Sequence, residues 1–328
     1  MRHLNQASPD SRLLRALLST LVGLLSVTGN FWLFAQELAA TKPDPVRFVS
    51  YNLKNYLKMD RRVGGELRKA APKPEEEIAK LVELLVATKP DIVGVCEIGD
   101  QADLSDLQKR LKEAGLDLPH SAWVNAADRT RHVAALSRFP IASTDHQEKL
   151  QYRMDEKEFD FQRGILDATV QVNPNYQLRL LGIHLKSKRK IYEGDQALMR
   201  RNEAHLLRAH VDKILEENGR SNILLYGDFN DTQNEAPIKA IKGRFGSERY
   251  MRDIQVADKD GYRWTYYWRY ADQYSRFDFA FVSKGLYPEV VQEQSLIQSH
   301  SDWFTASDHR PVVITVLPVD ADVGSVKE

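Results

Sequence analysis

Short apolar stretches alternate with polar segments along most of the chain, between Val46 and Leu317. Apolar stretches of this length, bounded by turn-forming residues, predict β-strands buried in a sheet. We therefore expect strands over Val46–Tyr51, Ile92–Cys96, Val133–Leu136, Ile165–Val172, Leu178–Leu185, Ile223–Tyr226, Phe277–Val282 and Pro311–Leu317.

Two longer segments have the apolar spacing of helices. The first begins at Pro74, and three glutamates occupy its first turn, where the helix dipole favours negative charge. Its apolar residues recur at helical spacing until Lys89-Pro90, which predicts its end. The second runs from Asp195 to Glu217, and Asn218-Gly219 predicts its C-cap. Strands interleaved with helices in this way indicate an α/β domain with mixed sheets covered by helices.

The first 40 residues have a different pattern. Arg12 and Arg15 precede an uncharged apolar run over residues 16–35, which is typical of a secretory signal. The run is also long enough to span a bilayer. We interpret residues 1–40 as a signal peptide or an N-terminal membrane anchor, with a buried helix as the third interpretation. The first two predict an exported protein, which is periplasmic, secreted or anchored through residues 16–35.

Charge and cysteine content narrow the functional classes. The chain has 46 basic and 46 acidic residues, so its formal net charge is +0. A protein that coats DNA by bulk electrostatics is usually markedly basic, whereas an enzyme that holds a phosphodiester briefly need not be. The one cysteine, Cys96, excludes an intramolecular disulfide and is interpreted as a small buried apolar residue.

Polar side chains stand where the predicted strands end. Each alone is most simply a turn former, but together they supply complementary chemistry. Carboxylates are hard oxygen ligands for magnesium or manganese, histidines exchange protons or neutralise developing charge, and amides orient a nucleophile. Strand ends also fix such groups on a rigid sheet. The residues are Asn52, Glu97, His184, Asp228, Asn230, Asp278, Asp308 and His309.

These residues lie in segments that resemble the endonuclease/exonuclease/phosphatase superfamily, which has the DNase I-like fold. The similarity extends from about Val46 to Leu317, and the chain resembles exported bacterial members. Gly-Asp-Phe-Asn and Ser-Asp-His-Arg-Pro, in this order and separation, are its most specific signals. The segments that carry it are Val49–Asn52, Asp91–Glu97, Leu136–Ile141, Gly182–Leu185, Gly227–Asn230, Arg276–Ser283 and Ser307–Pro311.

The resemblance implies a fold, a cofactor and a domain. The expected fold is a four-layered α/β sandwich, in which two packed mixed β-sheets are flanked by helices. Residues 41–328 would form the catalytic domain. The implied cofactor is Mg²⁺ or Mn²⁺, with Ca²⁺ as a further candidate.

The resemblance also implies a role for each strand-end residue. Glu97 would be the principal metal carboxylate, with Asn52 and Asp308 as further ligands or close neighbours of the metal. Asp228 would align or deprotonate the attacking water, and Asn230 would hold that water and a phosphate oxygen. Three further residues complete the expected catalytic set. His309 would stabilise the phosphorane, Asp278 would orient His309, and His184 would lie near the phosphate or leaving group.

Two departures from the family pattern bear on the substrate. DNA-cleaving members often have an asparagine shortly after the position of His184, where this chain has the basic run Lys186–Lys190. That run either rims the cleft, with Lys186, Lys188 and Arg189 binding substrate, or forms a solvated loop. In addition, Arg131-His132 stands where a glycine is common.

An aromatic run between Trp264 and Tyr270 also has two interpretations. It either stacks on bases or a lipid head group, or packs half of its rings as a β-hairpin. His205 and His210, in the second helix, are interpreted as surface or hydrogen-bonded helix histidines and not as zinc ligands.

The function expected first is an exported, monomeric, metal-dependent phosphodiesterase, a nuclease acting on DNA or RNA. The alternatives are a sphingomyelinase- or phospholipase-like enzyme, or a phosphatase acting on phosphorylated small molecules. A non-catalytic binding module on the same fold is the third. The membrane would be a partner only through an uncleaved N-terminal segment.

Overall fold

Two six-stranded mixed sheets form the centre of the protein, a computed structural model that describes residues 43–320. The predicted signal or anchor at residues 1–40 lies outside these residues. The first sheet has the order β17-β18-β1-β4-β6-β5, and only β1 and β4 are parallel in it. Its strands are β1 (Val46–Tyr56), β4 (Ile92–Ile98), β5 (His120–Trp123), β6 (His132–Ser137), β17 (Leu296–Ile297) and β18 (Val312–Val316).

The second sheet has the order β13-β16-β12-β11-β10-β7, and only β11 and β12 are parallel in it. Its strands are β7 (Ile141–Thr144), β10 (Leu166–Asn173), β11 (Tyr176–His184), β12 (Ile223–Asp228), β13 (Arg252–Asp253) and β16 (Asp278–Val282). All eight strands predicted from the sequence are therefore confirmed, and β1 continues five residues beyond its predicted end at Tyr51.

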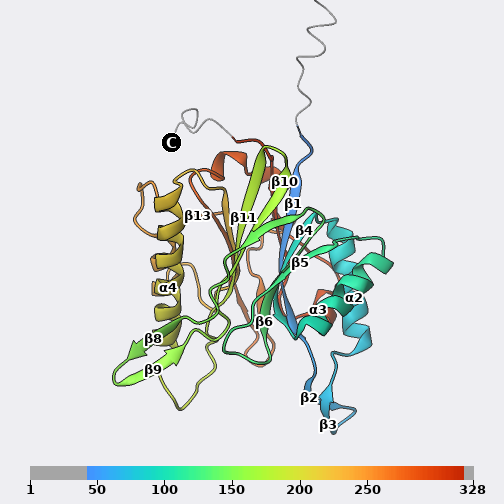
Figure 1. Ribbon diagram of the computed structural model, residues 1–328. Helices are drawn as coiled ribbons and strands as arrows, with labels where there is room; N and C mark the ends of the chain where they lie inside the picture. The colour runs from blue at the N-terminus through green and yellow to red at the C-terminus, as the bar shows by residue number, and fades with distance from the viewer. Residues whose placement is uncertain (1–42, 321–328) are drawn as a thin grey trace, which may run out of the picture. The chain divides into compact units, whose positions relative to one another are not determined.

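The sheets pack face to face and helices cover their outer faces, as Figure 1 shows. α2 (Glu75–Thr88) and α3 (Gln101–Glu113) cover the first sheet, whereas α4 (Gln196–Glu217) and α5 (Ala236–Lys242) cover the second. Between the sheets lies an apolar layer that includes Phe48, Cys96, Leu180 and Tyr226. The expected four-layered sandwich is confirmed, and Cys96 is the small buried residue that the sequence predicts.

Local signals explain the helix ends. α2 follows Pro74 and ends at Thr88, and the left-handed backbone of its cap residue Lys89 (φ 49°) closes the helix before Pro90. The Asp195 side chain accepts the N–H groups of Ala197 and Leu198 at the start of α4. α4 ends at Glu217 as predicted, but its cap residue Asn218 is extended (φ −147°) and not left-handed.

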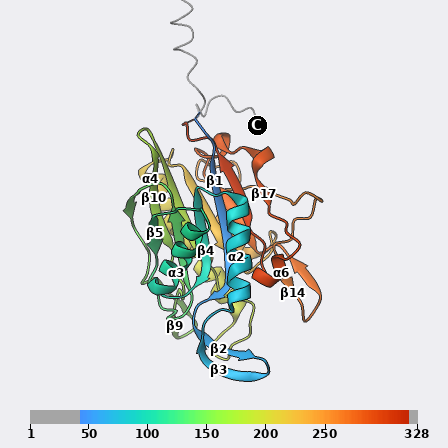
Figure 2. The ribbon, with the colours of Figure 1, turned by 90° about the vertical axis from the view of Figure 1, so that its right-hand side faces the viewer.

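Three hairpins project from the sandwich: β2 (Met59–Val63) with β3 (Glu66–Ala71), β8 (Gln151–Met154) with β9 (Lys157–Asp160), and β14 (Tyr266–Trp268) with β15 (Gln273–Ser275). The last confirms the hairpin interpretation of the aromatic run. Figures 1 and 2 show β2–β3 and β8–β9 at the end of the sandwich where β1 finishes. Within residues 43–320, no helix combines the length and the apolarity needed to cross a membrane.

Candidate active site

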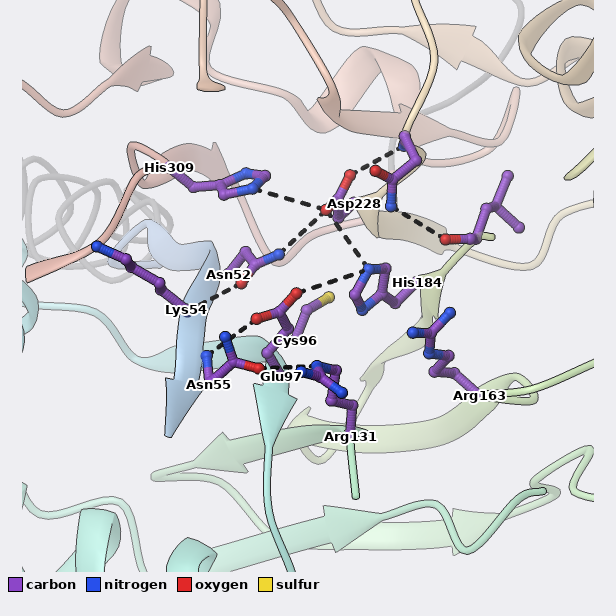
Figure 3. Close-up of polar contacts among 12 residues, drawn as sticks. Asn52, Lys54, Asn55, Cys96, Glu97, Arg131, Arg163, His184, Asp228 and His309 are labelled. Carbon is purple, nitrogen blue, oxygen red and sulfur yellow. Dashed lines mark hydrogen bonds and ion pairs between the residues drawn. The ribbon is translucent and has the colours of Figure 1, made fainter. Parts of the chain in front are cut away.

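The predicted polar residues meet because the two parallel strand pairs end at the same edge of the sandwich. Asn52 and Glu97 come from β1 and β4 of the first sheet, and His184 and Asp228 end β11 and β12 of the second. The antiparallel β16 begins at Asp278, directly opposite Asp228. Figure 3 shows the side chains of Asn52, Glu97, His184 and Asp228 directed toward one another.

Asp228 lies at the centre of this group, and its side chain is 3% exposed. Its Oδ2 accepts a hydrogen bond from Asn52 Nδ2 at 3.0 Å, and lies 3.6 Å from His184 Nε2 and 3.7 Å from His309 Nε2. Its Oδ1 accepts the backbone N–H of Asn230 at 2.9 Å. Burial raises the pKa of Asp228 to about 7. The cation of His309 opposes this rise, whereas the nearby negative charges of Asp278 and Glu97 add to it.

His309 is held as a cation. Its Nδ1 lies 2.8 Å from Asp278 Oδ2, so the ring donates to that carboxylate. Burial by itself lowers the pKa of His309, but Asp278 and Asp228 outweigh it and raise the pKa to about 10. The backbone N–H of Asp278 donates in turn to Thr265 Oγ1 at 3.0 Å.

Glu97 reaches the site through a β-bulge. The register of β4 shifts between Cys96 and Ile98, and Glu97 has a left-handed backbone (φ 62°) that a glutamate rarely adopts. Its Oε2 accepts the backbone N–H of Asn55, itself left-handed (φ 59°), at 2.9 Å. Strained backbone of this kind costs about 1–3 kcal/mol per residue and is concentrated at functional sites.

Arg131 and His132, which depart from the family pattern, both brace this bulge. Arg131 Nε donates to Asn55 Oδ1 at 2.7 Å, and the buried His132 ring bonds through Nδ1 to Gly99 O at 2.8 Å. Sequence reasoning missed Asn55, which lies beyond the predicted end of the first strand at Tyr51.

His184 is buried and neutral. Desolvation, followed by the charges of Arg163 and His309, holds its pKa well below the usual value. Its Nε2 lies between Asp228 and Glu97, 4.0 Å from Glu97 Oε1, and its Nδ1 has no hydrogen-bond partner among the described residues.

Gly-Asp-Phe-Asn folds as it does because Gly227 has a positive φ of 136°, and a Cβ there would lie 1.9 Å from Ile183 O. Only glycine fits between the strands at this point. Asn230, also left-handed (φ 50°), donates through Nδ2 to Leu185 O at 3.0 Å. This bond ties the end of β12 to the segment after His184.

The donor set fits a hard divalent cation. Glu97 Oε1 and Asp228 Oδ2 lie 4.0 Å and 3.6 Å from the same atom, His184 Nε2, so two carboxylates face one point. Carboxylate oxygens suit Mg²⁺, Mn²⁺ or Ca²⁺. Asn52 instead donates to Asp228, and its Oδ1 accepts the N–H of Lys54 at 3.0 Å, so its role as a metal ligand stays a prediction.

A second group of possible ligand atoms lies outside this site, formed by Asp145, Asp167 and His210 within 4.8 Å of one another. Asp167 already accepts two hydrogen bonds from Arg179, at 2.8 and 2.6 Å, and lies 2.7 Å from His210 Nε2. The guanidinium occupies the place of a cation there, and the group links α4 to β10 and β11. His210 is thus a hydrogen-bonded helix histidine and His205 is exposed, as the sequence predicts.

The predicted substrate-binding residues differ in their surroundings. Lys186 is half-buried beside His184, whereas Lys188 is exposed and pairs with Asp231 at 2.8 Å. Arg189 is exposed. Tyr266 belongs to the aromatic run identified in the sequence, and the structure places its ring centroid 4.8 Å from that of His309.

Comparison with known proteins places the chain in a family. The model described as Endonuclease/Exonuclease/phosphatase family matches residues 49–309. Its fold is similar to that of the endonuclease/exonuclease/phosphatase from Bacteroides vulgatus (TM-score 0.58, 16% identity, 84% of this chain and 99% of that one). It is also similar to sphingomyelinase C from Streptomyces griseocarneus (0.55, 14%, 84% and 100%) and to the human Nocturnin catalytic domain with bound sulfate anion (0.58, 17%, 83% and 93%).

No curated protein sequence matches this chain. The family match covers most of the chain and includes every strand-end residue identified above. The chain belongs to the endonuclease/exonuclease/phosphatase family.

Proposed function

We propose that this protein is a divalent-metal-dependent hydrolase of phosphodiester bonds, and that it is an exported nuclease acting on DNA or RNA. The observation that carries the proposal is the surroundings of Asp228. This buried carboxylate, with a pKa near neutrality, faces the cationic His309 and the neutral His184. A base and a cation directed at one point are the groups that water attack on a phosphodiester needs. Export rests on the sequence of residues 1–40 alone.

The side chains divide the chemistry between them. Asp228 accepts a proton from the attacking water, since a carboxylate with a pKa of about 7 is a competent base at neutral pH. The protonated His309 neutralises the charge that develops on the phosphate oxygens, and Asp278 keeps it oriented and protonated. Glu97 and Asp308 would hold the divalent cation, with Asn52 beside them. When bound, that ion neutralises and orients the phosphate.

A lipid phosphodiesterase is the second candidate. The observation that favours it is the tip of the β14–β15 hairpin, where Tyr270 is 84% exposed and Trp268 is 47% exposed. Exposed aromatic side chains of this kind are common where proteins contact a membrane interface. Similarity to sphingomyelinase C agrees with this candidate, although at 14% identity it concerns the fold alone.

The test uses the full-length protein with Mg²⁺ or Mn²⁺ and four substrates: supercoiled plasmid, single-stranded RNA, sphingomyelin and a phosphomonoester. Each assay is repeated with EDTA, with Asp228→Asn, and with Asp117→Asn as an exposed control. We expect cleavage of plasmid or RNA that EDTA abolishes and that Asp228→Asn lowers at least about a hundredfold. Cleavage of sphingomyelin or the monoester alone would replace nucleic acid as the substrate. No hydrolysis by a folded protein would favour a binding module.

A further inference from the structure

One cation beside Glu97 has no acidic partner at ion-pair distance. The Arg131 guanidinium donates to Asn55 Oδ1 at 2.7 Å and to Thr130 Oγ1 at 3.3 Å, and both acceptors are neutral. Among residues 43–320, no carboxylate oxygen lies within 4.0 Å of the guanidinium nitrogens of Arg131.

The nearest candidate for a counter-charge is already engaged. Asp128 Oδ2 pairs with Arg163 Nε at 3.0 Å, and Asp128 Oδ1 accepts the backbone N–H groups of Thr130 and Arg131. Figure 3 shows Arg131 and Arg163 near Glu97 and His184, with His309 on the far side of Asp228.

The position of Arg131 is fixed before any ligand binds. Its acceptor Asn55 is held by a further hydrogen bond, from Arg61 Nη2 to Asn55 O at 2.6 Å, and by its own N–H on Glu97. A preorganised side chain loses little conformational entropy on binding. Partly buried charges in proteins are normally paired, so an unpaired and fixed cation beside a catalytic carboxylate indicates that the ligand supplies the opposite charge.

We propose that Arg131 forms an anion subsite, which binds the phosphate next to the scissile phosphodiester along a nucleic acid strand. The subsite rests on the proposed function and deepens it. A nucleic acid presents a second phosphate beside every internal diester. The choline group of sphingomyelin is instead a cation, which the Arg131 guanidinium repels. Lys188 takes no part, since Asp231 already pairs with it.

The test compares three dinucleotides as substrates of the full-length protein. These are TpT, and TpT with an added terminal phosphate at its 5′ or its 3′ end. We expect one of the phosphorylated forms to be cleaved at the internal diester with kcat/KM about five- to tenfold above that of TpT, as a partly exposed ion pair allows. Bis(p-nitrophenyl) phosphate, which has no second anion, reports phosphodiesterase activity separately.

Variants of Arg131 then test whether this residue causes the higher kcat/KM of the phosphorylated dinucleotide. Arg131→Gln should bring the ratio of kcat/KM values toward one, and Arg131→Lys, which keeps the charge, should retain most of it. Arg129→Gln, at an exposed neighbouring arginine, is the matched control and should keep the wild-type ratio. Added salt should reduce the ratio in the wild type, because ions screen the pair. This last measurement needs no variant to fold.

Equal kcat/KM values for the three dinucleotides, or a ratio unchanged by both Arg131→Gln and salt, would overturn the subsite. Cleavage of bis(p-nitrophenyl) phosphate without cleavage of any dinucleotide would overturn it as well, but would leave the phosphodiesterase standing. If no diester is cleaved, the proposed function fails and the subsite fails with it.

Discussion

At the scale of single residues, the chemistry of the site comes from neighbours that shift ionisation in opposite directions. Burial raises the pKa of Asp228 to about 7, and the carboxylates around His309 raise its pKa to about 10. Near neutral pH, the protein therefore holds a base and a cation whose facing atoms are 3.7 Å apart. Neither property belongs to the residue type alone, since free aspartate is a weak base and free histidine is mostly neutral at pH 7.

The first residue-scale prediction concerns Asp278, which bonds to His309 Nδ1. In the wild type the pKa of His309 is raised above its ordinary value, so the cation persists until the pH approaches 10 and is lost above it. Asp278→Asn removes the bonded negative charge and lowers that pKa. We expect the alkaline limb of the kcat profile for bis(p-nitrophenyl) phosphate to move about one to three pH units lower. An alkaline limb at the wild-type pH would contradict the role of Asp278, and Asp117→Asn serves as control.

At the scale of elements, α4 fastens together the two segments that leave β11 and β12. Arg200 of this helix donates through Nε to Asp231 Oδ2 at 2.9 Å and through Nη1 to Lys186 O at 3.0 Å. One turn later, Glu203 accepts the backbone N–H of Lys186 at 2.6 Å. Both backbone groups of Lys186 are thus bound to one helix, which fixes the segment after His184 against the segment after Asp228.

The element-scale prediction is that Arg200→Ala loosens this connection. The variant leaves the buried Asp231 with the exposed Lys188 as its one cationic partner, so we expect the free energy of unfolding to fall by about 3 kcal/mol. We also expect kcat to fall, because His184 and Asn230 lose their common support. Arg201→Ala, at the exposed neighbouring position, should change stability by no more than about 0.5 kcal/mol. Urea unfolding of both variants measures the difference, and equal losses would show that the helix connection has no special weight.

At the scale of the whole molecule, the site exists because two sheets pack closely enough to bring their strand ends together. Tyr226 of β12 lies in the apolar layer between them, with its ring centroid 4.7 Å from that of Phe48 in β1. Gly94 of β4 leaves the space for this ring, since a Cβ there would lie 2.1 Å from Tyr226 Cε2. The separation of the sheets at this point is therefore set by a tyrosine facing a glycine.

The whole-molecule prediction is that Gly94→Ala forces the sheets apart or displaces Tyr226. Overpacking of this kind costs about 1–3 kcal/mol, and the rigid surroundings favour the upper end. Gly219→Ala is the matched control, because the nearest atom to its added Cβ is 3.6 Å away. Thermal unfolding of the two variants measures the cost. A thermal unfolding midpoint of Gly94→Ala as high as that of Gly219→Ala would contradict the close packing of Tyr226 on Gly94.

The sequence by itself determined eight of the strands, the helices α2 and α4, the fold class and most of the polar residues that meet at the site, but it missed α3 and most of the short strands. It could do so because burial and backbone preference act locally, and because Gly-Asp-Phe-Asn and Ser-Asp-His-Arg-Pro are short patterns with fixed geometry. The same two patterns predicted that Asp228 and His309 belong to one catalytic site.

Only the tertiary structure decided how these residues act on one another. The pairing of Arg131 with Asn55, the bulge at Glu97 and the position of Tyr266 beside His309 join segments far apart in the chain. The tertiary structure also gives Lys186 and Lys188 different surroundings, since Asp231 pairs with Lys188. Side-chain contacts and pKa shifts depend on distances across the two sheets, and no local pattern in the sequence records those distances.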